Sequence, residues 1–199
     1  MRRIGFFTED SFHEDFLSAL IQRFSREYEV PVTIQGYSVR GGITRMHFEL
    51  GEFLRDLKND RRHPPDAILV AADANCHGYL ERKQALEKIA EKYEGIGQLI
   101  IYAIPDPHVE RWMMVDPNAF LQVFGRGFDP PRYKCERGRY KKLLIEAIRD
   151  ADVQAPLGGR EYAGDIIQAM DLAFAEQNEQ SLEKLLKDLK GLFNRWTQV

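Results

Sequence analysis

No stretch of this sequence approaches the roughly 20 consecutive apolar residues that a membrane-spanning helix requires. The N-terminal stretch MRRIGFFTED contains arginines but has neither a long apolar segment nor a small-residue cleavage site, so it does not resemble a secretion signal. The 199 residues are 44% hydrophobic and 30% charged, which is typical of a globular protein large enough for a substantial core. We therefore predict a soluble, cytoplasmic protein that does not associate with membranes.

Cysteine is scarce, since only Cys76 and Cys135 are present. Their separation matches neither the spacing of zinc ligands nor that of redox-active pairs. Two such widely separated cysteines are typical of free thiols in a reducing cytoplasm. We therefore predict that both are unpaired.

Neither sign of charge dominates, since the net charge is −3. This balance argues against a protein that coats nucleic acid by charge alone. The charge is uneven, however, because residues 126–142, here called the basic segment, contain seven basic and two acidic residues. The basic ones are Arg126, Arg132, Lys134, Arg137, Arg139, Lys141 and Lys142. We predict that this segment binds a phosphate backbone, with Arg132, Lys134, Arg137 and Arg139 as substrate-binding residues.

Two nucleotide-binding motifs are missing, because no Gly-x-Gly-x-x-Gly follows the first predicted strand and no Walker A motif occurs. These absences weigh against a flavodoxin-like or Rossmann-like nucleotide binder. The apolar pattern nevertheless predicts alternating strands and helices up to about residue 117. Strands are predicted at 2–7, 30–39, 66–73 and 97–105, and helices at 14–28, 43–59 and 79–93. Such alternation is typical of an α/β fold with a mostly parallel sheet flanked by helices.

The pattern changes in the last third of the chain. A loop rich in glycine, proline and basic residues leads into helices predicted at 139–150, 160–176 and 179–196. The last of these has a strong apolar face, which packs either on the sheet or against a second copy of the chain in a homodimer. We divide the chain into an α/β domain, residues 1–120, and a basic and helical extension, residues 121–199, packed on the same domain.

The carboxyl ends of the predicted strands are acidic, and ligands of parallel sheets bind at these ends. Glu9 follows the first strand and Asp73 the third, with Asn75 two residues later. Alternation along an extended chain places Asp73 and Asn75 on one side, facing Glu9. Oxygen ligands of this kind suit Mg²⁺, which completes its shell with water and substrate phosphate. The alternative is structural: Asp73 caps the following helix, and Asn75 occupies a left-handed turn.

Three motifs resemble those of Toprim domains. "TEDSFHEDFL" aligns with Val-Glu-Gly-Pro-Thr-Glu-Glu-x-Phe-Leu, and "ILVAADAN" aligns with an apolar strand that ends in Asp-x-Asp. "VERWMMVDP" matches Glu-x-Trp-hydrophobic-hydrophobic-x-Asp-Pro and is the most specific of the three. The chain is therefore similar, over roughly residues 3–120, to the small stand-alone Toprim-like proteins of bacterial defence loci, which are related to the overcoming-lysogenization-defect nucleases.

The resemblance implies a catalytic set of Glu9, Asp73 and Glu110. It also implies that Mg²⁺ or Mn²⁺ is held by Glu9, Asp10, Asp73 and Asn75. Two positions depart from the family pattern, because Asp10 replaces a glycine and Asn75 replaces the second aspartate. Since asparagine supplies an amide oxygen without charge, either Asp10 takes over as a ligand or the metal site is weakened.

The function implied by the resemblance is a Mg²⁺-dependent phosphodiesterase or nuclease in antiviral defence, acting on DNA in preference to RNA. An ATPase partner would place the protein as one half of such a defence nuclease. The alternative is a non-catalytic component of a defence complex that senses nucleotides or docks a partner. Arg40 and His108 lie near strand ends and are also predicted to bind substrate. His13 is predicted to lie at the surface and Trp112 to lie buried beneath Glu110.

Overall fold

A parallel sheet forms the centre of the protein, whose computed structural model describes residues 1–39, 42–59 and 65–198. The strands are β1 (Arg2–Thr8), β2 (Val32–Ser38), β3 (Ala67–Ala71) and β4 (Ile100–Ala103), in the order β2-β1-β3-β4. Thr8 pairs with Ser38 on one side and with Ala71 on the other, so the carboxyl ends of these strands meet at one edge. The predicted α/β fold with a parallel sheet is confirmed.

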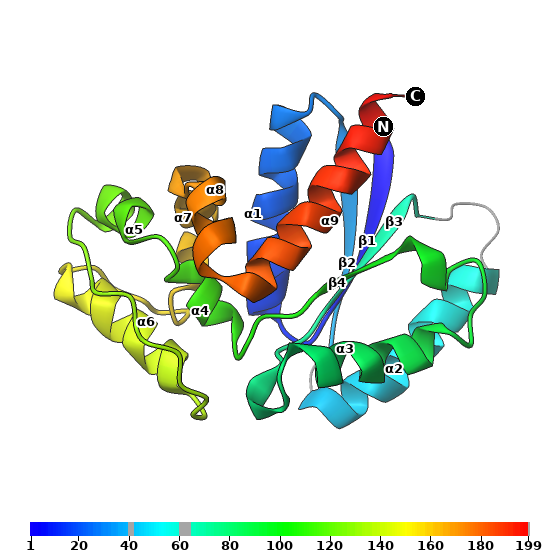
Figure 1. Ribbon diagram of the computed structural model, residues 1–199, viewed down its shortest axis with the longest axis horizontal. Helices are drawn as coiled ribbons and strands as arrows, with labels where there is room; N and C mark the ends of the chain where they lie inside the picture. Colours follow the sequence, from blue (N-terminus) through cyan, green and yellow to red (C-terminus); the bar gives the residue numbers. More distant parts are fainter. Residues whose placement is uncertain (40–41, 60–64, 199) are drawn as a thin grey trace.

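Helices cover both faces of the sheet (Figure 1). On one face lie α2 (Gly42–Asn59) and α3 (Tyr79–Ala90), and α1 (Ser11–Glu27) lies on the other. β1 is buried from both sides, since Phe6 packs into the cluster around α1 and Phe7 into the cluster around α2 and α3. This burial accounts for the unbroken apolar run of the first strand.

The C-terminal helices join the α1 side of the molecule. They are α4 (Val109–Met113), α5 (Pro117–Phe124), α6 (Arg139–Asp150), α7 (Ala163–Ala169), α8 (Leu172–Asn178) and α9 (Gln180–Thr197). Most of their buried apolar side chains belong to the same hydrophobic cluster as those of α1. In the described part of the chain, no helix combines the length and the apolarity needed to cross a membrane.

The single helix predicted at 160–176 is wrong, because the chain leaves helical geometry at Met170 (φ −63°, ψ 131°). Asp171 then caps α8 by accepting hydrogen bonds from the backbone N–H groups of Ala173 and Phe174. The backbone N–H of Asp171 donates to Oδ2 of the buried Asp116, at 2.8 Å. Competition from these local hydrogen bonds ends one helix and starts the next, although the apolar spacing runs through both.

α9 packs its apolar face inside its own chain. This face is fully or nearly fully buried in the cluster that it shares with α1, and it also contacts β4. Its buried apolar residues are Leu182, Leu185, Leu186, Leu189, Leu192 and Phe193. Of the two alternatives, packing on the sheet therefore accounts for this apolar face, and a homodimer through the C-terminal helix stays a prediction.

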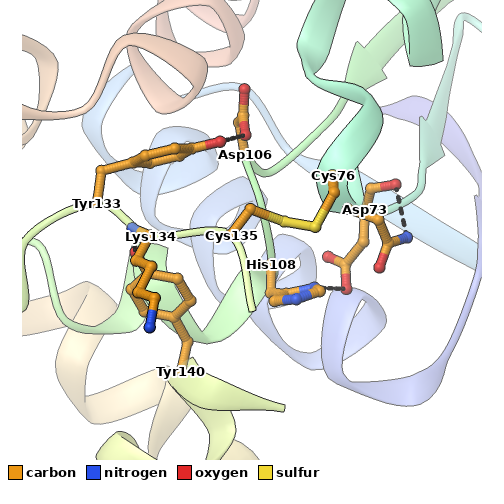
Figure 2. The surroundings of a disulfide bond; sticks show 9 residues. Asp73, Cys76, Asp106, His108, Tyr133, Lys134, Cys135 and Tyr140 are labelled. Carbon is orange, nitrogen blue, oxygen red and sulfur yellow. Dashed lines mark hydrogen bonds and ion pairs between the residues drawn. A yellow bond between two sulfur atoms is a disulfide. The ribbon is translucent and has the colours of Figure 1, made fainter. Parts of the chain in front are cut away.

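The two cysteines are not free thiols, contrary to the prediction. Cys76 and Cys135 form a disulfide with a Cα–Cα distance of 5.5 Å. Although 59 residues separate them in the sequence, the fold brings the loop after β3 beside the loop between α5 and α6 (Figure 2). Spacing could not reveal this pair, because only tertiary structure brings the two loops together.

Candidate functional site

The carboxyl ends of β1 and β3 form the topological switch point of the sheet, since the chain runs from β1 outward to β2 and then back across to β3. Open α/β sheets bind ligands at such a point. Glu9 follows β1 and Asp73 follows β3, and Oε2 of Glu9 accepts a hydrogen bond from the backbone N–H of Asp73 at 3.0 Å. The structure therefore brings together the two acids that the sequence singled out.

Asp10 serves as the N-cap of α1. Its Oδ1 accepts hydrogen bonds from the backbone N–H groups of Phe12 and His13, at 2.9 and 3.1 Å. The same oxygen lies 2.8 Å from Nδ1 of the His13 ring. Burial alone would raise the pKa of Asp10, but the hydrogen bonds from His13 and from the helix start lower it to about 2. One oxygen of Asp10, which was predicted to bind the metal, thus caps the helix instead.

The prediction that His13 lies at the surface is wrong, since only 1% of the residue is exposed. Its ring bridges two carboxylates, with Nδ1 on Asp10 and Nε2 at 3.1 Å from Oδ1 of Asp73. Ionised carboxylates only accept hydrogen bonds, so both ring nitrogens must donate and the imidazole must be protonated. Burial opposes this charge, but Asp73 and Asp10 outweigh it and raise the pKa of His13 well above its usual value.

Asp73 lies between His13 and His108. Its Oδ1 accepts hydrogen bonds from His13 and from the backbone N–H of Val109, and its Oδ2 lies 3.0 Å from Nδ1 of His108 (Figure 2). Burial would raise the pKa of Asp73, but the two imidazoles lower it. The hydrogen bond with Asp73 raises the pKa of His108. Within the described residues, Nε2 of His108 is buried and has no hydrogen-bond partner.

Glu9 and Glu110 differ from Asp73 in the direction of their pKa shifts. Burial, followed by repulsion from Asp73, raises the pKa of both. Glu110 lies in the first turn of α4, one residue beyond Val109, whereas Trp112 is 1% exposed and packs against Phe16. Trp112 is therefore buried as predicted, and the short helix α4 carries Glu110 close enough to feel the charge of Asp73.

Asn75 does not continue the extended conformation on which its predicted pairing with Asp73 depended. It adopts a left-handed backbone conformation with φ 52°, and its side-chain amide donates to the backbone oxygen of Asp73 at 3.4 Å. The turn alternative was correct for Asn75. The same backbone oxygen accepts a hydrogen bond from Nε of the buried Arg82, at 2.8 Å, a contact that no motif had indicated.

The predicted metal set does not fit Mg²⁺ or Mn²⁺ in this arrangement. Asp10 caps the start of α1, the side-chain amide of Asn75 donates to the backbone of Asp73, and both carboxylate oxygens of Asp73 accept from imidazole or backbone donors. No group of three or more His, Cys, Asp or Glu side chains in the described residues is arranged to hold a metal ion. The protonated ring of His13 already supplies positive charge beside Asp73, where the ion was expected.

The basic segment lies beside this cluster. The side chain of Tyr140 is fully buried, and its ring lies 6.4 Å from that of His108. Arg132, Lys134 and Arg137 are exposed, whereas Arg139 is half-buried at the start of α6. Arg40, also predicted to bind substrate, lies outside the described residues.

A hollow of about 480 Å³ adjoins the cluster on the side of β2. It is lined by the starts of α1 and α2 and by the end of β2, through Glu9, Asp10, Ser11, Glu14, Ser38, Val39 and Gly42. Glu9 is thus reachable from solvent, whereas only 12% of the His108 side chain is exposed and Tyr140 of the basic segment lies beside its ring.

Comparisons with protein-family models, curated proteins and solved structures found no match for this chain. The resemblance to the Toprim family therefore stays a prediction. Asp73, His13 and His108, together with the two neighbouring glutamates, define the candidate site.

Proposed function

We propose that the protein hydrolyses phosphodiester bonds of nucleic acid through acid–base chemistry at this cluster. The observation that carries the proposal is the Asp73–His108 pair, in which the carboxylate holds Nδ1 and leaves Nε2 unpaired within the described chain. A carboxylate that orients an imidazole in this way fixes the ring nitrogen that meets the substrate. The position at the switch point of the sheet supports the same conclusion.

Glu110 and His108, which carry opposite charges, are the two groups that transfer protons in this mechanism. Glu110, whose pKa is raised, accepts a proton from water while the water oxygen bonds to phosphorus. His108, whose pKa is also raised, donates the proton on Nε2 to the leaving oxygen as the phosphorus–oxygen bond breaks. Exposed arginines of the basic segment bind the neighbouring phosphates.

Mg²⁺ is not part of this proposal, because the side chains expected to bind it are engaged elsewhere. His13 instead acts as a fixed positive charge that keeps Asp73 ionised and in place. It does not contact the reacting atoms in this mechanism. Its role is to position Asp73, which in turn orients His108.

Two substitutions test the proposal. His108→Ala and Glu110→Gln should each lower cleavage of single-stranded or duplex DNA by about 100-fold or more, the usual contribution of a general acid or base. His77→Ala is the matched control, since His77 is exposed and pairs with Glu81 rather than with the cluster. Cleavage that survives both substitutions would contradict the assignment of these residues.

A non-catalytic role as a binding component is the second candidate. It is favoured by the internal hydrogen bonding of Asp73 and by Asn75, which supplies no second acid at this edge. This candidate predicts salt-dependent binding of nucleic acid without cleavage by the wild-type chain. Binding that is unchanged in His108→Ala, together with no cleavage in the oxidised or reduced protein, would establish it over the hydrolase.

A further inference from the structure

The disulfide joins the candidate site to the loop that carries much of the basic segment. Cys76 lies three residues after Asp73, and Cys135 lies between α5 and α6, in residues 125–138. Figure 2 shows the bond beside His108 and Asp73, with Tyr133 and Lys134 on the Cys135 side. One covalent bond therefore fixes this loop against the strand end that supplies Asp73.

The loop has few other fixed points. It contains no helix or strand, and glycines with positive φ, Gly125 and Gly138, stand at its two ends. Phe128 packs against Phe120 at the core, and Arg126 donates to the backbone oxygen of Asp150. Beyond Phe128, the loop is held by polar contacts, such as the hydrogen bond of Tyr133 Oη to Asp106 at 2.9 Å and that of the Lys134 N–H to Tyr140 at 3.0 Å, and by the guanidinium of Arg111 over the ring of Tyr133. A loop of this kind opens locally at small cost once its covalent bond is removed.

The closed loop leaves little room at His108. Only 12% of the His108 side chain is exposed, and Nε2 is buried. The ring of Tyr140 lies beside it, and the hydroxyl of Tyr140 holds the loop backbone through Lys134. With the disulfide intact, the imidazole nitrogen that lacks a partner in the described chain is therefore covered.

We propose that Cys76–Cys135 is a thiol-exchange site whose reduction releases the loop and uncovers His108. Cys76 is exposed and Cys135 half-buried, so a small thiol such as glutathione can reach the bond at Cys76. The attacking thiolate bonds to Sγ of Cys76 and expels the Cys135 thiolate, which takes up a proton. A second thiol then attacks the mixed disulfide and releases Cys76, which also becomes a thiol. Overall, two external thiols become one disulfide, and the protein gains two electrons and two protons. The inference goes beyond the proposed function, and only its effect on activity depends on that function.

Hydrogen exchange of the whole chain tests the release directly. Amides within 126–138 should exchange about tenfold faster or more after native reduction by glutathione, whereas amides of α9 should not change. The double variant Cys76→Ser, Cys135→Ser should show the fast exchange without any reductant. Alkylation of both thiols followed by peptide mapping reports whether reduction occurred.

Three results would overturn the proposal. The first is a disulfide that glutathione does not reduce in the folded protein, and the second is a reduced protein whose loop exchange is unchanged. The third is fast exchange that extends to α9, because the bond would then maintain the whole fold. None of these results depends on nuclease activity, so a failed cleavage assay with fast loop exchange would count against the proposed function alone.

Discussion

Nε2 of His13 lies 3.1 Å from Oδ1 of Asp73, which joins the start of α1 to the end of β3 inside the protein. Nδ1 of the same ring lies 2.8 Å from Asp10, so one buried imidazolium sits between two carboxylates. The energetics and the chemistry of the site both depend on this bridge.

Removing the bridge should cost stability. We expect His13→Gln to lower the free energy of unfolding by about 3 kcal/mol, because it leaves Asp73 buried with one charged partner fewer. Urea denaturation measures this loss, and His77→Gln should change the same quantity by less than about 0.5 kcal/mol. A loss for His13→Gln no larger than that of the control would contradict the bridge.

The same bridge predicts how stability depends on pH. The pKa of His13 is raised in the folded chain, so its stabilisation is fully present below about pH 6.5, the pKa of an unfolded histidine. As the pH rises towards and through the folded-state pKa, the stabilisation is lost, by up to about 1.4 kcal/mol per pH unit.

The raised pKa of His108 lowers the stability in the same pH window. The raised pKa values of Glu9 and Glu110 also make the stability fall as the pH rises, from about pH 4.5 upward. Chemical denaturation at a series of pH values should therefore show stability falling above pH 6.5, with a shallower fall in His13→Gln. A wild-type stability that stays flat or rises above pH 6.5 would be inconsistent with a protonated His13.

Asp116 should matter to the fold and not to the chemistry. One of its oxygens caps α5 through Asn118 and Ala119, and the other accepts the backbone N–H of Asp171. Asp116→Ala should lower the free energy of unfolding by about 2–3 kcal/mol, because a helix cap and a buried acceptor are lost together. Asp171→Ala, which removes only the cap of α8, should cost about 1 kcal/mol. Equal losses in the two variants would contradict the dual role of Asp116.

Arg137 should contribute to nucleic-acid binding through charge alone. It is exposed in the basic segment, and a phosphate contact changes the slope of log affinity against log salt by about 0.9 for duplex DNA. Arg137→Ala should reduce that slope by this amount. Arg45→Ala provides the control, because Arg45 is exposed on α2 and pairs with Glu49. An unchanged slope in Arg137→Ala would remove the basic segment from the interface.

The fold followed from the sequence because apolar runs and helical spacing are local signals. β1, β3 and most helices were predicted within a few residues, and Glu9 and Asp73 were placed together by the rule for strand ends. His13 was missed because its burial depends on the contact between α1 and the end of β3. One signal was available, since an N-cap aspartate three residues before a histidine places both side chains on the first helical turn.

The disulfide could not be predicted, and the left-handed turn at Asn75 could be offered only as one of two alternatives, for a different reason. Both depend on how the loop after β3 turns, and that turn is fixed by tertiary contacts, including the hydrogen bonds of the Ala74 and Asn75 N–H groups to Pro105 and Pro107. The Asp-Pro pair of the third motif had a local explanation, because Asp116 is an N-cap and Pro117 occupies the first turn of α5.

The central claim is that the charge beside Asp73 comes from His13 and that the chemistry comes from His108 and Glu110. The most direct test is cleavage of a labelled DNA oligonucleotide by the wild-type protein, oxidised and reduced, in excess EDTA and in Mg²⁺. We expect cleavage rates that agree within about twofold in the two media, because none of the proposed steps requires an ion, and a loss of activity in His108→Ala in both. Cleavage that occurs only in Mg²⁺ and disappears in EDTA would contradict the account and return Asp73 to the role of a metal ligand.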